Sequence, residues 1–348
     1  MLSSLKNLID KLSQKSILQK EEWIFLLSNR NSELETYTFE KARQVVIQHY
    51  GNKVFARGLI EFTNYCKNNC FYCGIRCENR KVERYRLTKE EILACCRNGN
   101  ELGFKTFVLQ GGEDPFFTDE RILEIISTIK QAFPDHALTL SFGERSFASY
   151  LAFKNAGADR YLLRHETANS KHYRQLHPKN LSDIPRKQCL LDLKQIGFQT
   201  GTGFMVGSPY QTIENLADDM LFIADFQPQM LGIGPFIPHE DTPFADFPAG
   251  SVELTLFLLA LSRLLLPQVL LPATTAMGTL DPQGREKAVL AGANVVMPNL
   301  SPLSVRKQYM LYNNKIATGL EAAEGVQKLA DSMAAIGYEL VHERGDYC

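Results

Sequence analysis

The chain has 348 residues, of which 45% are hydrophobic and 22% are charged, as in an ordinary globular protein. A formal net charge of −1 gives no electrostatic reason to expect a nucleic acid or a membrane surface as a partner. The eight cysteines form no disulfide framework and no signal peptide is recognisable, so we expect a cytoplasmic protein. The most apolar run, residues 254–266, is too short for a membrane span, which needs about 20 residues.

Residues 1–50 predict a set of helices. Leu5, Leu8 and Leu12 recur at helical spacing, and a third short helix is expected over residues 40–50. We expect these helices to form an N-terminal cap that carries no chemistry.

Eight apolar runs follow, and helix signals separate them. The runs are residues 54–63, 105–110, 137–142, 159–165, 198–206, 230–237, 269–276 and 293–298. Strand alternating with helix predicts parallel strands joined by right-handed crossovers. Eight repeats are the count of a complete (β/α)8 TIM barrel, and an open doubly wound sheet is the alternative. We therefore expect a helical cap over residues 1–50, an α/β barrel over 51–310 and a C-terminal helical extension over 311–348.

Polar and glycine-rich segments follow the apolar runs. Residues 110–114 follow the second run in this way, and residues 164–167 end the fourth. In a barrel the carboxyl ends of the strands meet on one rim, where barrel enzymes carry their active sites. The sequence therefore predicts an active site on this rim.

The first run leads into a cysteine cluster of Cys66, Cys70 and Cys73, with Tyr72 directly before the last cysteine. Thiolates at this spacing can hold one soft metal centre, which could be an iron–sulfur cluster, zinc or Cu(I). Three ligands leave one iron of a [4Fe–4S] cluster open to a small molecule. A zinc site with Cys77 as the fourth ligand and a set of metal-free thiols are the alternatives.

This cysteine spacing resembles the signature of the radical S-adenosylmethionine (SAM) enzymes. The resemblance implies that SAM chelates the open iron and is cleaved by one-electron reduction to a 5′-deoxyadenosyl radical. Gly112, Glu113 and Asp114 then look like the SAM-binding glycine turn of that superfamily, and an ordinary turn before a helix is the alternative.

Two further residues are candidate SAM contacts. Glu166 could accept hydrogen bonds from the ribose hydroxyls, or it could form an ion pair with Arg164 on the same side of the strand. Arg186 could bind the methionyl carboxylate through two parallel hydrogen bonds from its guanidinium, or it could be an exposed arginine at the start of a helix.

Longer segments resemble the HydE-type maturases of [FeFe]-hydrogenase, and they lie between residue 54 and about residue 312. They are residues 60–66, 84–86, 109–115, 158–169, 232–239, 272–279 and 296–299. The segments Arg-His-Glu-Thr-Ala-Asn and Ala-Thr-Thr-Ala-Met-Gly are particular to that family, whereas the cysteine and glycine motifs are shared with biotin synthase and methylornithine synthase.

The resemblance implies a barrel that holds one [4Fe–4S] cluster and SAM at its mouth. Its substrate would be an organometallic iron–cyanide–carbonyl–cysteine complex delivered by HydG, and its product would pass to HydF. The residues that match cofactor contacts are Tyr72, Gly112, Glu113, Asp114, Glu166 and Arg186. The residues that match the substrate cavity are Arg57, Gln110, Met230, Thr274, Thr275 and Tyr309.

Two other functions stay open. One is an amino-acid mutase of the methylornithine-synthase type or another enzyme like biotin synthase, and the other is a cluster-bearing scaffold without turnover. Core packing is the alternative role for Met230 and Tyr309.

The C-terminal part differs from some HydE proteins, which carry cysteines there for a second cluster. Residues 310–347 contain no cysteine and Cys348 stands alone, so we expect a single cluster. Residues 321–336 instead predict an amphipathic helix.

Overall fold

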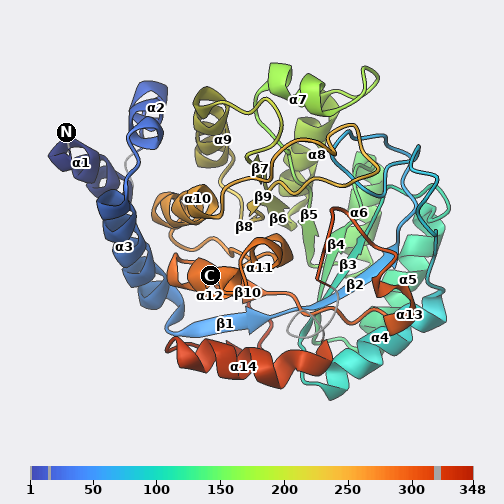
Figure 1. The fold of residues 1–348 in the computed structure, drawn as a ribbon. Coiled ribbons are helices and arrows are strands. Elements are labelled where there is room, and N and C mark those ends of the chain that lie inside the picture. Colours follow the sequence, from blue (N-terminus) through green and yellow to red (C-terminus); the bar gives the residue numbers. More distant parts are fainter. Residues whose placement is uncertain (1, 15–16, 317–322, 348) are drawn as a thin grey trace.

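The computed structural model describes residues 2–14, 17–316 and 323–347. The N-terminal part is helical as expected, and Leu5, Leu8 and Leu12 are buried, but the third helix begins at Ser32 rather than near residue 40. These helices lie at one side of the molecule, where they pack against α9 (Ile213–Phe226) and α10 (Val252–Leu265) (Figure 1). Their bounds are α1 Leu2–Ser13, α2 Lys20–Ser28 and α3 Ser32–Tyr50.

The centre of the molecule is a parallel sheet of six strands in the order β2-β3-β4-β5-β6-β8. The strands are β2 Gly58–Thr63, β3 Thr106–Gly111, β4 Ala137–Ser141, β5 Arg160–Leu162, β6 Gln199–Thr202 and β8 Met230–Leu231. Every residue of β2 is buried, as expected for a parallel strand that is covered on both faces. The α/β class and the parallel pairing are therefore confirmed.

Helices connect successive strands and cover the outer side of the sheet (Figure 1). They are α4 Lys89–Glu101, α5 Asp119–Ala132, α6 Phe147–Asn155, α7 Ser170–Leu176, α8 Asp183–Ile196, α11 Thr275–Leu280 and α12 Gly284–Leu290, in addition to α9 and α10. The predicted capping box is present at α4, where Thr88 Oγ1 accepts from the amide of Glu91 at 3.2 Å. Gly197 ends α8 with a φ of +90°, a conformation that glycine adopts without strain.

The remaining strands are short. β1 (Lys53–Ala56) pairs in parallel with β10 (Val295–Val296) and with β11 (Glu339–Val341), while β7 (Met205–Val206) pairs with β9 (Gly234–Pro235). Isolated parallel bridges join Met230 to Leu270, Pro272 to Val295 and Leu59 to Asn299. Among the described residues, the hydrogen-bonded strands form three separate sheets rather than one closed sheet. The complete eight-stranded barrel therefore stays a prediction.

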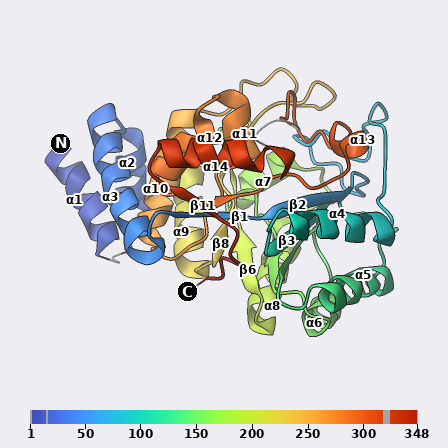
Figure 2. The same cartoon turned by 90° about the horizontal axis from the view of Figure 1, so that it is seen from below.

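The C-terminal extension is not helical throughout, contrary to expectation. After α13 (Leu303–Arg306) come a 3-10 turn over Ala323–Gly325 and α14 (Val326–Ala335), and the predicted residues 321–322 lie outside the described residues. β11 then adds an unpredicted strand beside β1 (Figure 2). The last described residues lie under the amino ends of the central strands, where the Arg344 carbonyl accepts from Thr106 Oγ1 at 2.9 Å.

Helix α10 contains most of the most apolar run in the sequence, and its residues from Thr255 to Leu264 are all buried. Across the described ranges, no helix combines the length and the apolarity that crossing a membrane requires.

Candidate active site at the carboxyl ends of the strands

The cysteine loop follows β2 and is held in place by one arginine. The guanidinium of Arg84 donates to the carbonyl oxygens of Asn64, Ile75, Arg76 and Asn79, at 2.9 Å for Ile75 and 2.7 Å for Arg76. A loop without regular secondary structure gains its order from such side-chain to backbone bonds. Arg84 therefore fixes the segment that carries the three cysteines.

The three cysteines are half-buried in the same loop, and the protein around them excludes most of the water from their sulfurs. Burial raises the pKa of Cys73 to about 12, with a further contribution from the charge of Cys66. Burial also raises the pKa of Cys70 well above its usual range, and the neighbouring Cys73 and Cys66 add to that shift. Thiolates so disfavoured in isolation need a positive centre, which a bound metal supplies.

The alternative of a single zinc ion needs four ligands around one point. Thiolates that bind one zinc at about 2.3 Å lie roughly 3.8 Å apart, whereas the thiolates of a cube bind different irons and lie farther apart. Among the residues that the structure describes, no three His, Cys, Asp or Glu side chains are grouped closely enough to hold one ion. Cys77 is exposed, and its amide donates to the Asn68 carbonyl at 2.9 Å.

The glycine turn after β3 lies directly against the first cysteine. A Cβ on Gly112 would lie 2.1 Å from the Tyr65 carbonyl oxygen and 2.8 Å from Cys66 Cβ, so only glycine fits. The amide of Lys67 also donates to the Glu113 carbonyl at 2.9 Å. The two motifs, which are separated by about 40 residues in the sequence, thus form one site.

The side chain of Glu113 belongs to a buried charge network with Arg186. Arg186 Nη2 donates to Glu113 Oε1 at 3.3 Å, and Arg186 Nε forms an ion pair with Glu144 Oε1 at 2.9 Å. Burial raises the pKa of Glu144 above its usual value. Arg186 is therefore buried and paired rather than exposed at a helix start. Glu144 lies in the polar segment that ends the third apolar run, but it was not among the predicted site residues.

Asp114 has a different role from its neighbours in the turn. Its carboxylate accepts from Arg86 Nε at 2.7 Å, from Arg86 Nη2 at 2.9 Å and from Thr63 Oγ1 at 2.8 Å. Burial alone would raise the pKa of Asp114, but the bonds from Arg86, Phe116 and Thr63 outweigh it and lower the pKa. These partners occupy the Asp114 side chain, which leaves only its backbone to contact a ligand.

Glu166 has an unusual backbone conformation and a buried side-chain oxygen that accepts no hydrogen bond from the described residues. Its φ is +66°, a conformation in which residues other than glycine are uncommon and which often marks functional positions. Glu166 Oε2 lies 3.4 Å from Arg164 Nη2, so the expected ion pair is present. Within the described part of the chain, however, Glu166 Oε2 accepts no hydrogen bond, and Arg164 Nε and Nη2 donate none. These buried polar atoms are free for a polar ligand.

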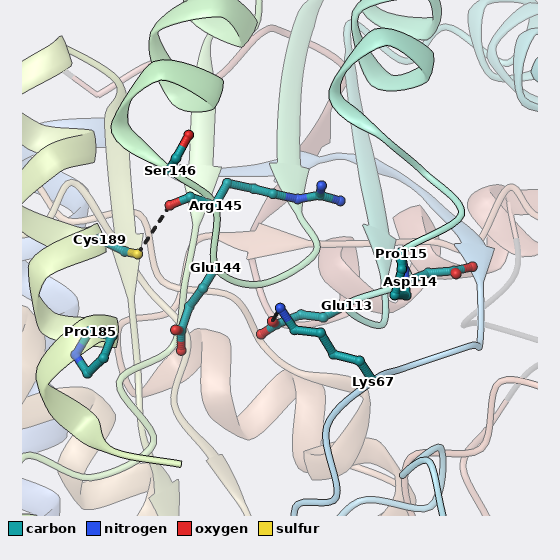
Figure 3. Close-up of a pocket in the computed structure, with 9 residues that line it drawn as sticks. All are labelled: Lys67, Glu113, Asp114, Pro115, Glu144, Arg145, Ser146, Pro185 and Cys189. Atoms are coloured by element: carbon teal, nitrogen blue, oxygen red, sulfur yellow. Dashed lines mark hydrogen bonds and ion pairs between the residues drawn. The ribbon is translucent and has the colours of Figure 1, made fainter. Parts of the chain in front are cut away.

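A pocket of about 610 Å³ opens beside this network. Figure 3 shows the carboxylates of Glu113 and Glu144 facing one another across it, with the amine of Lys67 beside Glu113. The lining residues are Lys67, Glu113, Asp114, Pro115, Glu144, Arg145, Ser146, Pro185 and Cys189. Cys66, Cys70 and Cys73 are not among its lining residues.

Comparisons with known proteins agree with this geometry. Residues 60–223 match the model of the Radical SAM superfamily. The chain is 49% identical over 278 residues to the [FeFe] hydrogenase maturase subunit HydE of Thermotoga maritima, which covers 80% of this chain and 79% of that protein. The chain belongs to the HydE family of radical SAM enzymes.

Other relatives lie within the same superfamily. The chain is 31% identical over 306 residues to the 3-methylornithine synthase of Methanosarcina barkeri, covering 86% of this chain and 85% of that one. The crystal structure of a methylornithine synthase superimposes with a TM-score of 0.84 at 27% identity, over 97% of this chain and 98% of that one. The HydG maturase structure has the same TM-score at 20% identity, covering 99% of this chain and 77% of that one, and shows a shared fold.

Membership in the HydE family implies a [4Fe–4S] cluster and SAM, and the residues fit both groups. The buried thiols suit a metal centre, Gly112 leaves room beside Cys66, and the unpartnered oxygen of Glu166 suits hydroxyl donors. Tyr72 Oη lies 3.1 Å from His177 Nε2, and a hydrogen bond also joins the Tyr72 side chain to that of Cys70. Tyr72 thereby joins the cysteine loop to the residue that follows α7.

Some of the residues predicted for a HydE substrate cavity do meet inside the sheet. Arg57 Nη1 lies 3.4 Å from Met230 Sδ, and Arg57 Nη2 donates to the Gly345 carbonyl at 3.1 Å. Tyr309 is almost fully buried, and a hydrogen bond joins its side chain to that of Gln110. Thr274 Oγ1 is buried and has no partner among the described residues, whereas Thr275 begins α11.

The sequence reasoning missed a buried ion pair beside Tyr309. Lys315 Nζ lies 2.5 Å from Glu61 Oε1 and 5.0 Å from the centre of the Tyr309 ring. Asn299 Nδ2 donates to Glu61 Oε2 at 2.8 Å. The available signal was Glu61 itself, a carboxylate within an otherwise apolar parallel strand.

Proposed function

We propose that this chain is a radical SAM maturase of [FeFe]-hydrogenase, with one [4Fe–4S] cluster bound by Cys66, Cys70 and Cys73. The observation that carries the proposal is the 49% identity to HydE, which extends over four fifths of the chain. The packing of Gly112 against Cys66 supports it, because the turn that would bind SAM lies beside a cysteine that would bind the cluster. When bound, the cluster and SAM supply a one-electron cleavage that yields a carbon radical.

The residues around Gly112 have distinct roles toward SAM. Backbone groups of the turn at Gly112, Glu113 and Asp114 receive the amino group of the methionyl part. Arg186, whose guanidinium also contacts Glu113, Glu144 and the Arg164 carbonyl, would bind the methionyl carboxylate. Glu166 accepts from the ribose hydroxyls through its unpartnered oxygen.

We further propose that the inner cavity binds an organometallic iron–cysteine precursor that comes from HydG, and that the product goes to HydF. The lining residues would be Arg57, Gln110, Met230, Thr274, Thr275 and Tyr309. The buried guanidinium of Arg57 lies against the Met230 thioether and donates to the Gly345 carbonyl, and its Nε has no hydrogen-bond partner among the described residues, so it can also bind an anionic ligand. A sheltered cavity of this kind protects a reactive intermediate from water.

The complete (β/α)8 barrel belongs to the same proposal. The bridges from Met230 to Leu270 and from Pro272 to Val295, followed by the pairing of β10 with β1, run between the two ends of the six-stranded sheet. We propose a helical cap over 1–50, a barrel over 51–310 and a mixed extension over 311–348. Free buried thiols and an oxygen-sensitive cluster favour the cytoplasm.

An amino-acid mutase is the second candidate, and the 31% identity to 3-methylornithine synthase favours it over a cluster-bearing scaffold without turnover. The maturase and the mutase differ in substrate. A mutase would convert an amino acid into an isomer with the same mass, whereas a maturase would leave amino acids unchanged and produce a new paramagnetic iron species from the HydG product.

The test begins with anaerobic reconstitution and measurement of iron, EPR and 5′-deoxyadenosine. We expect about four irons per chain and SAM cleavage in the wild type. Cys70→Ala should lose both, and Cys77→Ala, the matched control, should keep both. SAM cleavage that persists in Cys70→Ala would show that the cysteines are wrongly assigned. Restoration of hydrogenase activity in a mixture with HydG and HydF then tests the maturase function directly.

A further inference from the structure

Residues 165–168 form a tight turn that sets the position of Glu166. The amide of Thr167 donates to the His165 carbonyl at 2.8 Å, across only two residues. The amide of Glu166 donates to the Gly203 carbonyl at 3.0 Å, and Glu166 has the left-handed φ of +66°. A residue in such a conformation persists only where surrounding contacts hold it there.

One carboxylate oxygen ties the two ends of this turn together. Asp219 Oδ1, from α9 on the outer side of the strands (Figure 1), accepts from the Ala168 amide at 2.5 Å and lies 3.3 Å from His165 Nε2. On its other side, His165 Nδ1 lies 2.8 Å from Thr202 Oγ1 of β6. The turn that carries Glu166 is thus fastened to a helix and to a strand.

The buried Asp219 carboxylate lowers the stability of the fold, and the need to fill space in the core does not explain why a carboxylate is present there. Asp219 is fully buried and His165 is 1% exposed, while Asp219 Oδ2 has no hydrogen-bond partner among the described residues. Burying a carboxylate with an unsatisfied oxygen is unfavourable, and an apolar side chain would fill the same volume without that cost. A requirement for the exact shape of the turn accounts for the carboxylate.

We propose that Asp219 and His165 are positioning residues that hold Glu166 in the conformation that recognises the ribose of SAM. The inference rests on the proposed function, in which Glu166 contacts the ribose hydroxyls. Asp219 touches no ligand, and it acts only through the turn. Loss of the Asp219 oxygen therefore lowers affinity for the ribose hydroxyls specifically, rather than affinity for every part of SAM.

The experiment compares binding of SAM with binding of its 2′,3′-dideoxy analogue to the reconstituted, air-free protein. Hydrogen bonds to a charged acceptor are worth roughly a 10- to 100-fold change in Kd, so the wild type should prefer SAM by about that factor. Glu166→Gln and Asp219→Leu should each bring the preference close to one. Asp219→Asn, which keeps an oxygen for Ala168, should retain the preference.

Asn294→Leu is the matched control, because Asn294 is also fully buried and its Oδ1 also lies within hydrogen-bond distance of one amide, that of Leu271, and one nitrogen-bearing side chain, that of Arg263. It should leave the preference unchanged. A second measurement needs no cluster or SAM. The rates of amide hydrogen exchange at Thr167 and Ala168 should increase in Asp219→Leu and stay unchanged in Asn294→Leu.

The outcomes separate the two claims. A preference that survives Glu166→Gln overturns the ribose contact of the proposed function and the inference with it. A preference lost in Glu166→Gln but kept in Asp219→Leu overturns the positioning role alone. Should Asp219→Leu fail to fold, Thr202→Val removes only the hydroxyl beside His165, and an unchanged preference there likewise overturns the positioning role.

Discussion

Lys315 and Glu61 are 254 positions apart in the sequence, yet they form a buried ion pair beside Tyr309, with 2.5 Å between Nζ and Oε1. Lys315 comes from the segment after α13 and Glu61 from the middle of β2. The pair joins the C-terminal segment to the wall of the proposed substrate cavity, and it neutralises the negative charge within that wall.

Lys315→Met should destabilise the protein more than a surface substitution does. Removing one member of a buried ion pair leaves the other uncompensated, which costs about 3–5 kcal/mol of unfolding free energy. Adding Glu61→Gln to Lys315→Met should recover part of that loss. Urea unfolding of the two single variants and the double variant provides the measurement, and strictly additive effects would mean that the pair does not interact.

Gly112→Ala should prevent the cluster from being incorporated. A methyl group at this position overlaps the Tyr65 carbonyl oxygen and the Cys66 side chain, so the two motifs cannot stay in contact. Iron content and visible absorbance after reconstitution should fall at least tenfold. Gly232→Ala is the control, because the nearest atom to its added Cβ is 3.9 Å away. Normal iron content in Gly112→Ala would contradict the close approach.

Asp346→Ala should weaken the C-terminal closure under the sheet. Asp346 Oδ1 accepts from Arg160 Nη2 at 2.6 Å, and Arg160 is fully buried. Loss of a bond to a buried charge costs roughly 2 kcal/mol, which should appear as a lower urea midpoint. Glu343→Ala removes an ion pair with Lys53 in which both side chains are exposed, and it should shift stability by less than about 0.5 kcal/mol. Equal effects of the two changes would argue against this role of the tail.

The metal-free chain should lose stability as the pH falls from 7.5 to 5, partly through His177. Burial lowers the pKa of His177 from 6.5 to about 3. The unfolded chain therefore binds the proton first, so the stabilising contribution is complete above pH 6.5 and is lost progressively toward pH 3. At pH 5 this linkage amounts to about 2 kcal/mol. His177→Gln should show a correspondingly smaller difference between urea midpoints at pH 7.5 and 5, and an identical pH dependence would exclude a neutral, buried His177.

Local patterns in the sequence were sufficient for much of the fold. The helix that begins after Thr88 and the end of α8 at Gly197 follow from capping residues, and the buried strands follow from continuous apolar runs. β11 was missed because it is short, partly exposed and stabilised by its pairing with β1 rather than by its own composition. Strand pairing between distant segments is a tertiary interaction that no local period reveals.

The sequence by itself determined the chemistry of this protein: three cysteines at a cluster-binding spacing, a glycine turn and the segments that resemble HydE. Only the tertiary structure decided which side chains are available for it. In the folded chain, the Asp114 carboxylate is already bonded to Arg86, whereas one oxygen of Glu166 accepts no hydrogen bond from the described residues. Asp219 lies beside the turn that contains Glu166. The reason is physical: a residue's type sets which bonds it can form, whereas burial and the geometry of distant neighbours set which of those bonds are already satisfied.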